Sequence, residues 1–151
     1  MQHCPLFALP FVIYRKESNI MSTTKQKYVQ PYLFFDGRCE EAIEFYKKAI
    51  GINVEMLMRY KDSPDPNHCG PPGTENKIMH ASFKIGDSLI MASDGRCAGK
   101  ETFQGFALSI PVQTEVEADK LFAALSEGGQ VVMPLTKTFY SPKFEIGRAH
   151  V

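Results

Sequence analysis

A pattern of strands around one helix occurs twice along the chain, and this repeat limits the possible folds more than any other feature. The segments CEEAIEFYKKAIG (39–51) and TEVEADKLFAALSEGG (114–129) both have the apolar spacing of an amphipathic helix. Glu41 aligns with Glu117 and Tyr46 aligns with Phe122, and the two positions of each pair differ by 76. Strand-like sequence stands before and after each helix. The repeat therefore predicts a duplicated module.

The first copy follows the order strand, helix, strand, strand, strand. YVQPYLFFDG (28–37) and NVEMLMRY (53–60) flank the helix and read as strands, and Gly51 is a typical helix stop. A loop rich in proline, glycine and asparagine follows at 61–76. The segment KIMHASFKIGDSLIMASDG (77–95) then reads as a hairpin that turns at Gly86-Asp87. We predict a βαβββ module over residues 27–95.

The second copy begins in the same order but does not reach its end. GFALSIPV (105–112) reads as a strand, Thr114 and Glu117 form a capping box, and QVVMPLTKTFY (130–140) reads as the next strand. The offset of 76 carries residue 77 to position 153, which lies past Val151. We therefore expect an α+β fold of tandem βαβββ modules, with the second module (104–144) incomplete. Such a sheet would keep an unpaired edge.

Both ends of the chain are expected to lie outside the domain. The codons GAG ATC GGA AGA GCA CAC GTC encode residues 145–151, EIGRAHV, and contain a widely used sequencing-adapter sequence, so this segment is expected to be an adapter artefact. Residues 1–20 are either translated upstream sequence or a disordered extension, because RKESNIM can be encoded by a purine-rich ribosome-binding stretch before Met21. In the first case Met21 is the start and the source is bacterial.

The composition excludes several classes of function. Seventeen basic and seventeen acidic residues give no net charge, which argues against partners such as nucleic acid or an anionic membrane. The four cysteines form no C-x-x-C pair, as is typical of free thiols in a reducing, cytoplasmic setting. No apolar run approaches the roughly 20 residues of a membrane-spanning helix. The opening segment also lacks the basic region of a signal peptide.

Residues 27–144 resemble the PhnB-like branch of the vicinal oxygen chelate superfamily, which has the glyoxalase and bleomycin-resistance fold. The resemblance is carried by PYLFFDGRCEEAIEFYKKAIG, KIMHASFKIGDSLIMASD and MPLTKTFYSPKFE. It implies a curved mixed sheet around a cleft, commonly in a homodimer, with a closing hairpin after the KTFY stretch. Some members are labelled as ubiquinone-pathway methyltransferases, but the sequence has no G-x-G turn that would hold the methyl donor.

The resemblance also implies where a metal would be bound. Metal-using relatives carry His, Gln or Glu ligands on the first and last strands of each module, and the matching positions here are Gln30, Met91 and Phe106. Methionine and phenylalanine do not ligate a hard divalent ion. We therefore expect no metal site of the family type, unless closing strands supply ligands or a register shift brings in Ser93 or Asp94.

Two residues of the predicted hairpin are catalytic candidates. Alternation places His80 on the more polar face of its strand, where it could act as a general base or ligand. Asp94 closes the hairpin and could pair with it. The alternatives are a hydrogen-bonded structural histidine and an Asp-Gly turn. Candidate ligand-binding residues are Gln30, Tyr32, Phe34, Met91, Phe106, Phe139 and Tyr140, whose aromatic members would either stack on a flat ligand or pack the sheet.

Two functions from different classes follow from these observations. The first is binding of a small organic molecule in an aromatic-lined cleft, as in antibiotic-resistance relatives that sequester their ligand. The second is a divalent-metal-dependent enzyme of the lyase, isomerase or dioxygenase type, acting on a substrate with vicinal oxygens. The missing metal ligands favour the first, whereas His80 with Asp94 keeps the second open.

Overall fold

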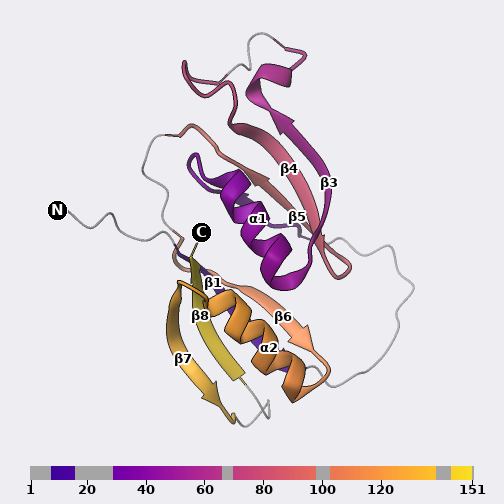
Figure 1. Cartoon of the computed structure of the whole chain (residues 1–151), viewed down its shortest axis with the longest axis vertical. Coiled ribbons are helices and arrows are strands. Elements are labelled where there is room, and N and C mark those ends of the chain that lie inside the picture. The colour runs from indigo at the N-terminus through magenta and orange to yellow at the C-terminus, as the bar shows by residue number, and fades with distance from the viewer. Residues whose placement is uncertain (1–7, 16–28, 66–69, 98–102, 139–143, 151) are drawn as a thin grey trace, which may run out of the picture. The chain divides into compact units, whose positions relative to one another are not determined.

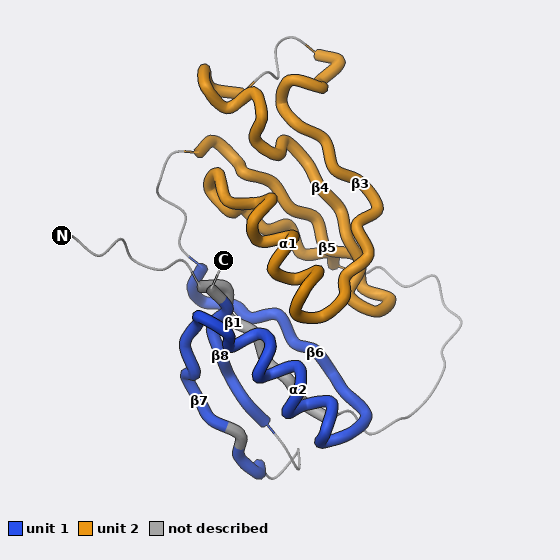
Figure 2. The backbone as a smooth tube through the Cα atoms, viewed as in Figure 1, with its two compact units in different colours: residues 1–27, 102–151 blue, residues 28–101 orange. Residues whose placement is uncertain are grey.

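The computed structural model describes residues 8–15, 29–65, 70–97, 103–138 and 144–150 (Figure 1). The chain divides into two compact units (Figure 2). Unit 1 comprises residues 1–27 and 102–151, and unit 2 comprises residues 28–101. Among these described residues, each unit has one α-helix and one four-stranded mixed sheet. The predicted α+β class is thus confirmed.

Unit 2 has the βαβββ order that the sequence predicts. Its elements are β2 (Tyr32–Phe34), α1 (Cys39–Ile50), β3 (Asn53–Arg59), the short 3-10 turn η1 (Tyr60–Asp62), β4 (Ile78–Ile85) and β5 (Ser88–Ser93). The strands lie in the order β2-β5-β4-β3, with β2 parallel to β5 and the other neighbours antiparallel. The hairpin between β4 and β5 turns at Gly86-Asp87, as expected, because the last pair in its register is Ile85 with Ser88.

Helix α1 packs one apolar stripe on the sheet of unit 2. Ala42, Ile43 and Tyr46 are buried at helical spacing, and the ring of Tyr46 stacks on Phe83 of β4 at a centroid distance of 6.2 Å. The helix ends at Gly51, whose φ of 66° is the left-handed conformation that glycine adopts without steric cost. Helix α1 therefore fixes which face of the sheet is buried.

Unit 1 repeats this topology. Its elements are β6 (Leu108–Val112), α2 (Glu115–Ser126), β7 (Gln130–Thr136), β8 (Phe144–His150) and the N-terminal strand β1 (Ala8–Arg15). The strand order is β6-β1-β8-β7, with β1 parallel to β6 and antiparallel to β8. Both α1 and α2 have 12 residues, and their bounds differ by the predicted offset of 76. The duplication is thus visible in the structure.

The sheet of unit 1 differs from the expected unfinished one. Strands β8 and β1 take the two places that β4 and β5 hold in unit 2. Residues 144–150 thus belong to a strand, and so do residues 8–15 of the segment expected to be upstream sequence or a disordered extension. The physical reason for this difference is that the backbone N–H and C=O groups of β6 and β7 need hydrogen-bond partners. Any extended segment can supply them, whether or not it repeats the sequence of β4 or β5. How the two terminal segments arose stays a prediction.

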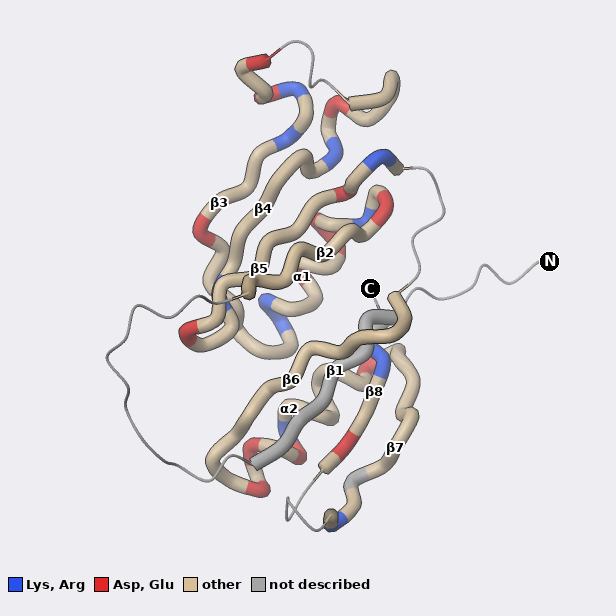
Figure 3. Tube along the Cα trace, turned by 180° about the vertical axis from the view of Figure 1, so that it is seen from behind, with Lys and Arg blue, Asp and Glu red and all other residues tan. Residues whose placement is uncertain are grey.

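Charged residues occur mainly on the helices, at turns and at strand ends (Figure 3). In unit 2, the middle of the sheet is made of apolar and uncharged polar residues. Within the ranges that the structure describes, no helix is long and apolar enough to cross a membrane.

Candidate functional site

The sheet of unit 2 has one face that helix α1 does not cover, and most candidate residues of this unit lie on it. Phe83 points toward α1, so the strand alternation turns His80 to the opposite side. The register pairs Met58 with His80 and Tyr32 with Met91. We call this surface the open face and define it by Tyr32, Phe34, Met58, His80 and Met91.

Two aromatic rings of strand β2 dominate the open face. Tyr32 and Phe34 are 39% and 43% exposed, although both are large and mostly apolar. Their rings stack with centroids 4.9 Å apart and an interplanar angle of 19°. Between them in sequence, Leu33 is buried on the other side. Strand β2 therefore divides its residues between the core and a solvent-facing aromatic surface.

Tyr32 is joined to His80 across the sheet. The Tyr32 hydroxyl and His80 Nδ1 lie 2.9 Å apart, and the ring centroids are separated by 5.6 Å. Strand β5 lies between β2 and β4, so the tyrosine side chain reaches over β5 to make this hydrogen bond. The sequence pattern indicated Tyr32 as a ligand-binding candidate and His80 as a catalytic candidate, but it gave no reason to expect a contact between them.

Burial raises the pKa of the Tyr32 phenol above its ordinary value, and a hydrogen bond with Ser93 acts in the opposite direction. Burial also raises the pKa of Tyr60, whose hydroxyl donates to the carbonyl oxygen of Gly95. Both phenols therefore stay protonated at neutral pH. A protonated Tyr32 can donate its hydrogen to the imidazole of His80.

Asp94 has a structural role in unit 2. Its carboxylate is 1% exposed and accepts hydrogen bonds from the backbone N–H of Cys39 and of Ile78, each at 2.6 Å. It thereby caps the first turn of α1 and holds the start of β4. The structure pairs the His80 imidazole with Tyr32 instead of the proposed Asp94. Burial is the main cause that raises the pKa of the Cys39 thiol, and the nearby charge of Asp94 adds to it.

The structure does not assign the remaining sequence candidates to the open face. Gln30 is partly buried and lies just before β2, whose pairing with β5 begins at Tyr32. Phe106 lies in unit 1 before β6, where it is 46% exposed and makes an edge-on ring contact with Phe103. Phe139 and Tyr140 fall outside the described residues. The structure thus brings together Tyr32, Phe34, His80 and Met91.

Two of the three residues at the expected metal positions, Met91 and Phe106, do not fit a hard divalent cation, whereas Gln30 offers an amide oxygen. Met91 offers a thioether and Phe106 offers no donor atom, whereas such ions prefer oxygen and imidazole ligands. Among the described residues, no three His, Cys, Asp or Glu side chains come together as a metal-binding group. We therefore derive no chemical step through a metal.

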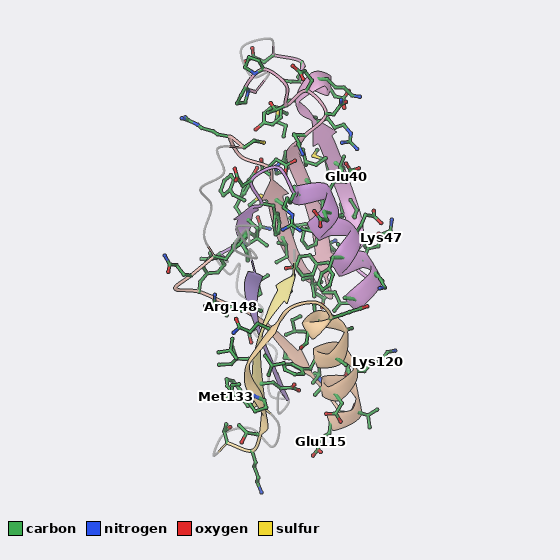
Figure 4. The ribbon with its side chains drawn as sticks, turned by 60° about the vertical axis from the view of Figure 1, so that its left-hand side comes forward. Glu40, Lys47, Glu115, Lys120, Met133 and Arg148 are labelled. Atoms are coloured by element: carbon green, nitrogen blue, oxygen red, sulfur yellow. The ribbon has the colours of Figure 1, made fainter. Side chains whose placement is uncertain are left out.

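Two charged residues of strands β3 and β4 are held in ion pairs. Lys84, at the far end of β4, lies 2.7 Å from Glu55 of β3. Arg59 forms two hydrogen bonds with the carboxylate of Glu40, at 3.0 and 2.6 Å, which tie the end of β3 to α1. Figure 4 shows Glu40 and Lys47 on the helix. The open face thus combines aromatic and thioether groups with the Tyr32–His80 hydrogen bond.

Comparison with known proteins gives the family. Residues 27–145 match the family described as 3-demethylubiquinone-9 3-methyltransferase, which is most of the chain. The chain belongs to this family. It is 31% identical over 123 residues to protein YjdN of Escherichia coli (strain K12), which covers 77% of this chain and 84% of that protein.

Two solved structures agree with the fold. Protein PA1353 from Pseudomonas aeruginosa has 37% sequence identity and a TM-score of 0.70, over 81% of this chain and 89% of that chain. A Bacillus cereus protein, described as a putative 3-demethylubiquinone-9 3-methyltransferase and PhnB protein, has 29% identity and a TM-score of 0.63, over 78% and 87%. The PhnB-like resemblance of the sequence is thereby confirmed.

Proposed function

We propose that this chain binds a small, planar organic molecule on the open face of unit 2. The observation that carries the proposal is the stacked, half-exposed pair of Tyr32 and Phe34 beside the His80 imidazole. Large aromatic side chains usually bury most of their surface, so two on one solvent-facing strand indicate a surface that a ligand covers. Met58 and Met91 add polarizable groups that adapt to different ring shapes.

Binding without methyl transfer is the activity we propose, in the manner of sequestering members of the vicinal oxygen chelate superfamily. The family description names a methyltransferase, and so does the description of the Bacillus cereus protein. A methyltransferase must also hold a methyl donor, for which the sequence has no G-x-G turn. The open face by itself supplies stacking surfaces and a hydrogen-bonding group, which suffice for binding.

A titration with bicyclic aromatic compounds tests this proposal, and calorimetry or ligand-observed NMR gives the dissociation constants. The variant Phe34→Ala removes one stacking ring and is expected to weaken binding about fivefold, since an aromatic contact contributes about 1 kcal/mol beyond its area. Met133→Ala in β7 of unit 1 is the control, because Met133 is also exposed and apolar (Figure 4). Equal affinities of the two variants, or no binding to the unaltered chain, would contradict the proposal.

We also infer that the protein works as a cytoplasmic homodimer. Edge strand β7 supports this, because its consecutive residues Val131, Val132 and Met133 are all at least 39% exposed. An exposed apolar edge strand tends to pair with another chain. Light scattering of Val132→Lys should then show a larger monomer fraction than the unaltered chain does.

A further inference from the structure

We infer that the open face selects ligands that carry a hydrogen-bond acceptor oxygen, such as a ring carbonyl, because Tyr32 holds His80 as a donor through Nε2. This inference rests on the proposed function and adds the chemical class of the ligand. It begins with the 2.9 Å contact between the Tyr32 hydroxyl and His80 Nδ1. In a neutral imidazole, one ring nitrogen carries the proton and the other accepts.

The direction of this hydrogen bond follows from the chemistry of its two partners. A phenol is a stronger donor than an imidazole N–H, and an imidazole nitrogen is a stronger acceptor than a phenol oxygen. Burial keeps the Tyr32 phenol protonated. The hydroxyl therefore donates to Nδ1, and the proton of the neutral ring stays on Nε2. His80 consequently offers one N–H to a ligand, and Tyr32 acts as the positioning residue.

The surroundings of the pair restrict the ligand further. Phe34 stacks on Tyr32, and strand pairing places Met58 beside His80 and Met91 beside Tyr32. The nearby cation Lys84 is engaged by Glu55 at 2.7 Å. A neutral planar ring is favoured by aromatic and thioether groups, and a carbonyl on that ring would accept from Nε2. A ring whose polar group is only a donor would leave this N–H without its bond.

The test compares coumarin, a planar bicycle with an acceptor carbonyl and no donor, with indole, a planar bicycle with a donor N–H and no acceptor oxygen. The quantity measured is the ratio of their dissociation constants in the unaltered chain and in three variants. Tyr32→Phe and His80→Phe should each shift the ratio about fivefold toward indole, as expected for one hydrogen bond. Ser88→Ala, at the exposed start of β5 and on the other side of that strand from Met91, should leave it unchanged.

A second measurement reads the imidazole directly. Long-range proton–nitrogen NMR distinguishes the two neutral tautomers, and His80→Phe identifies the His80 signals among the four histidines of the chain. We expect the proton on Nε2 in the unaltered chain and a mixture of tautomers in Tyr32→Phe. A proton held on Nδ1 in the unaltered chain would overturn the inference, whichever ligands bind.

The outcomes separate this inference from the proposed function. If both probes bind and the ratio is the same in all four proteins, the acceptor selectivity is wrong and the binding function stands. If neither probe binds to the unaltered chain, the proposed function is wrong for planar ligands and the inference is overturned with it. A ratio that changes in Tyr32→Phe and His80→Phe, but not in Ser88→Ala, supports both.

Discussion

Units 1 and 2 have the same sheet topology but obtain their strands from different parts of the chain. In unit 2, a continuous segment supplies the order β2-β5-β4-β3. In unit 1, the equivalent order β6-β1-β8-β7 needs β1, which precedes all of unit 2 in sequence. A strand position can thus be filled by a segment from another part of the chain, provided that this segment satisfies the backbone hydrogen bonds of its neighbours.

The two units also differ in the residues that could bind a ligand. The offset of 76 relates Tyr32 and Phe34 of β2 to Leu108 and Ile110 of β6, so the aromatic pair has aliphatic counterparts. Unit 1 instead exposes Val131, Val132 and Met133 on an edge strand. The same backbone plan therefore carries a stacking surface in one unit and an aliphatic edge in the other.

The helix N-termini show a third difference. Helix α1 receives the buried carboxylate of Asp94, which lies 55 positions from its partner Cys39. Helix α2 is capped locally, because Thr114 Oγ1 accepts from the N–H of Glu117 at 3.2 Å. The reciprocal bond of the predicted capping box is shifted by one residue, since Glu117 accepts from the N–H of Gln113. The N-terminus of α1 in unit 2 therefore depends on a long-range contact, whereas that of α2 in unit 1 depends on a local one.

Removing residues 1–20 should have the largest effect on stability, and this effect should be confined to unit 1. The deletion takes away β1 and leaves β6 and β8 without their common neighbour. We expect amide hydrogen exchange in β6 and β8 to rise at least about 100-fold, whereas β4 and β5 of unit 2 keep their protection. Unchanged protection in both units would show that β1 is not part of the sheet of unit 1.

Asp94→Ala should destabilise unit 2. The substitution leaves the backbone N–H groups of Cys39 and Ile78 without their buried acceptor, which costs about 3 kcal/mol of unfolding free energy. Asp87→Ala removes an exposed carboxylate from the turn between β4 and β5, and as the control it should cost less than about 0.5 kcal/mol. Chemical denaturation measures both. Equal losses would refute the capping role of Asp94.

Thr114→Ala should have a smaller effect, confined to unit 1. Replacing an N-cap threonine by alanine costs about 1 kcal/mol, because one donor of the first helical turn loses its acceptor. Hydrogen exchange of α2 and α1 reports the two units separately. If the threonine substitution costs as much as Asp94→Ala, the distinction between a local and a long-range cap disappears.

Arg59→Gln should raise the pKa of Glu40. It should have little effect on the free energy of unfolding, since the ion pair between Arg59 and Glu40 lies at the surface. The hydrogen bond from Arg59 holds the pKa of Glu40 below its ordinary value. The stabilisation is therefore present above the unfolded-state pKa and is lost as pH falls through the lower folded-state value. Carboxyl carbon NMR should show the pKa of Glu40 rising in this variant.

Lys84→Gln provides the control for that titration. It breaks the pair between Lys84 and Glu55 on the same sheet and should leave the pKa of Glu40 unchanged. If the Glu40 pKa is the same in Arg59→Gln as in the unaltered chain, the bond between α1 and β3 does not form in solution.

The sequence was sufficient for the elements that depend on local patterns. The apolar spacing of 39–51, the stop at Gly51 and the turn at Gly86-Asp87 were predicted and confirmed. Each is decided by neighbours in the chain, so the sequence contains the needed information. The capping box at Thr114 and Glu117 likewise marked the start of α2, which the structure places at Glu115.

Long-range partners could not be predicted in the same way. Strand β1 has no copy in the repeat, so nothing in the periodicity assigned it a place between β6 and β8. The contact between Tyr32 and His80 depends on β5 lying between their strands, and the roles of Asp94 depend on where its side chain turns. The order of strands in a βαβββ module is the signal that could have joined Tyr32 with His80.

The most direct test of the account is a titration of the methyl-labelled chain with coumarin, followed by NMR of the methionine methyl groups. The chain has seven methionines, of which Met58 and Met91 lie on the open face and Met133 lies on β7 of unit 1. We predict that the signals of Met58 and Met91 shift in proportion to bound ligand and that Met133 stays in place. Shifts confined to Met133, or no shift at Met58 and Met91 at saturating coumarin, would contradict the assignment of the ligand site to unit 2.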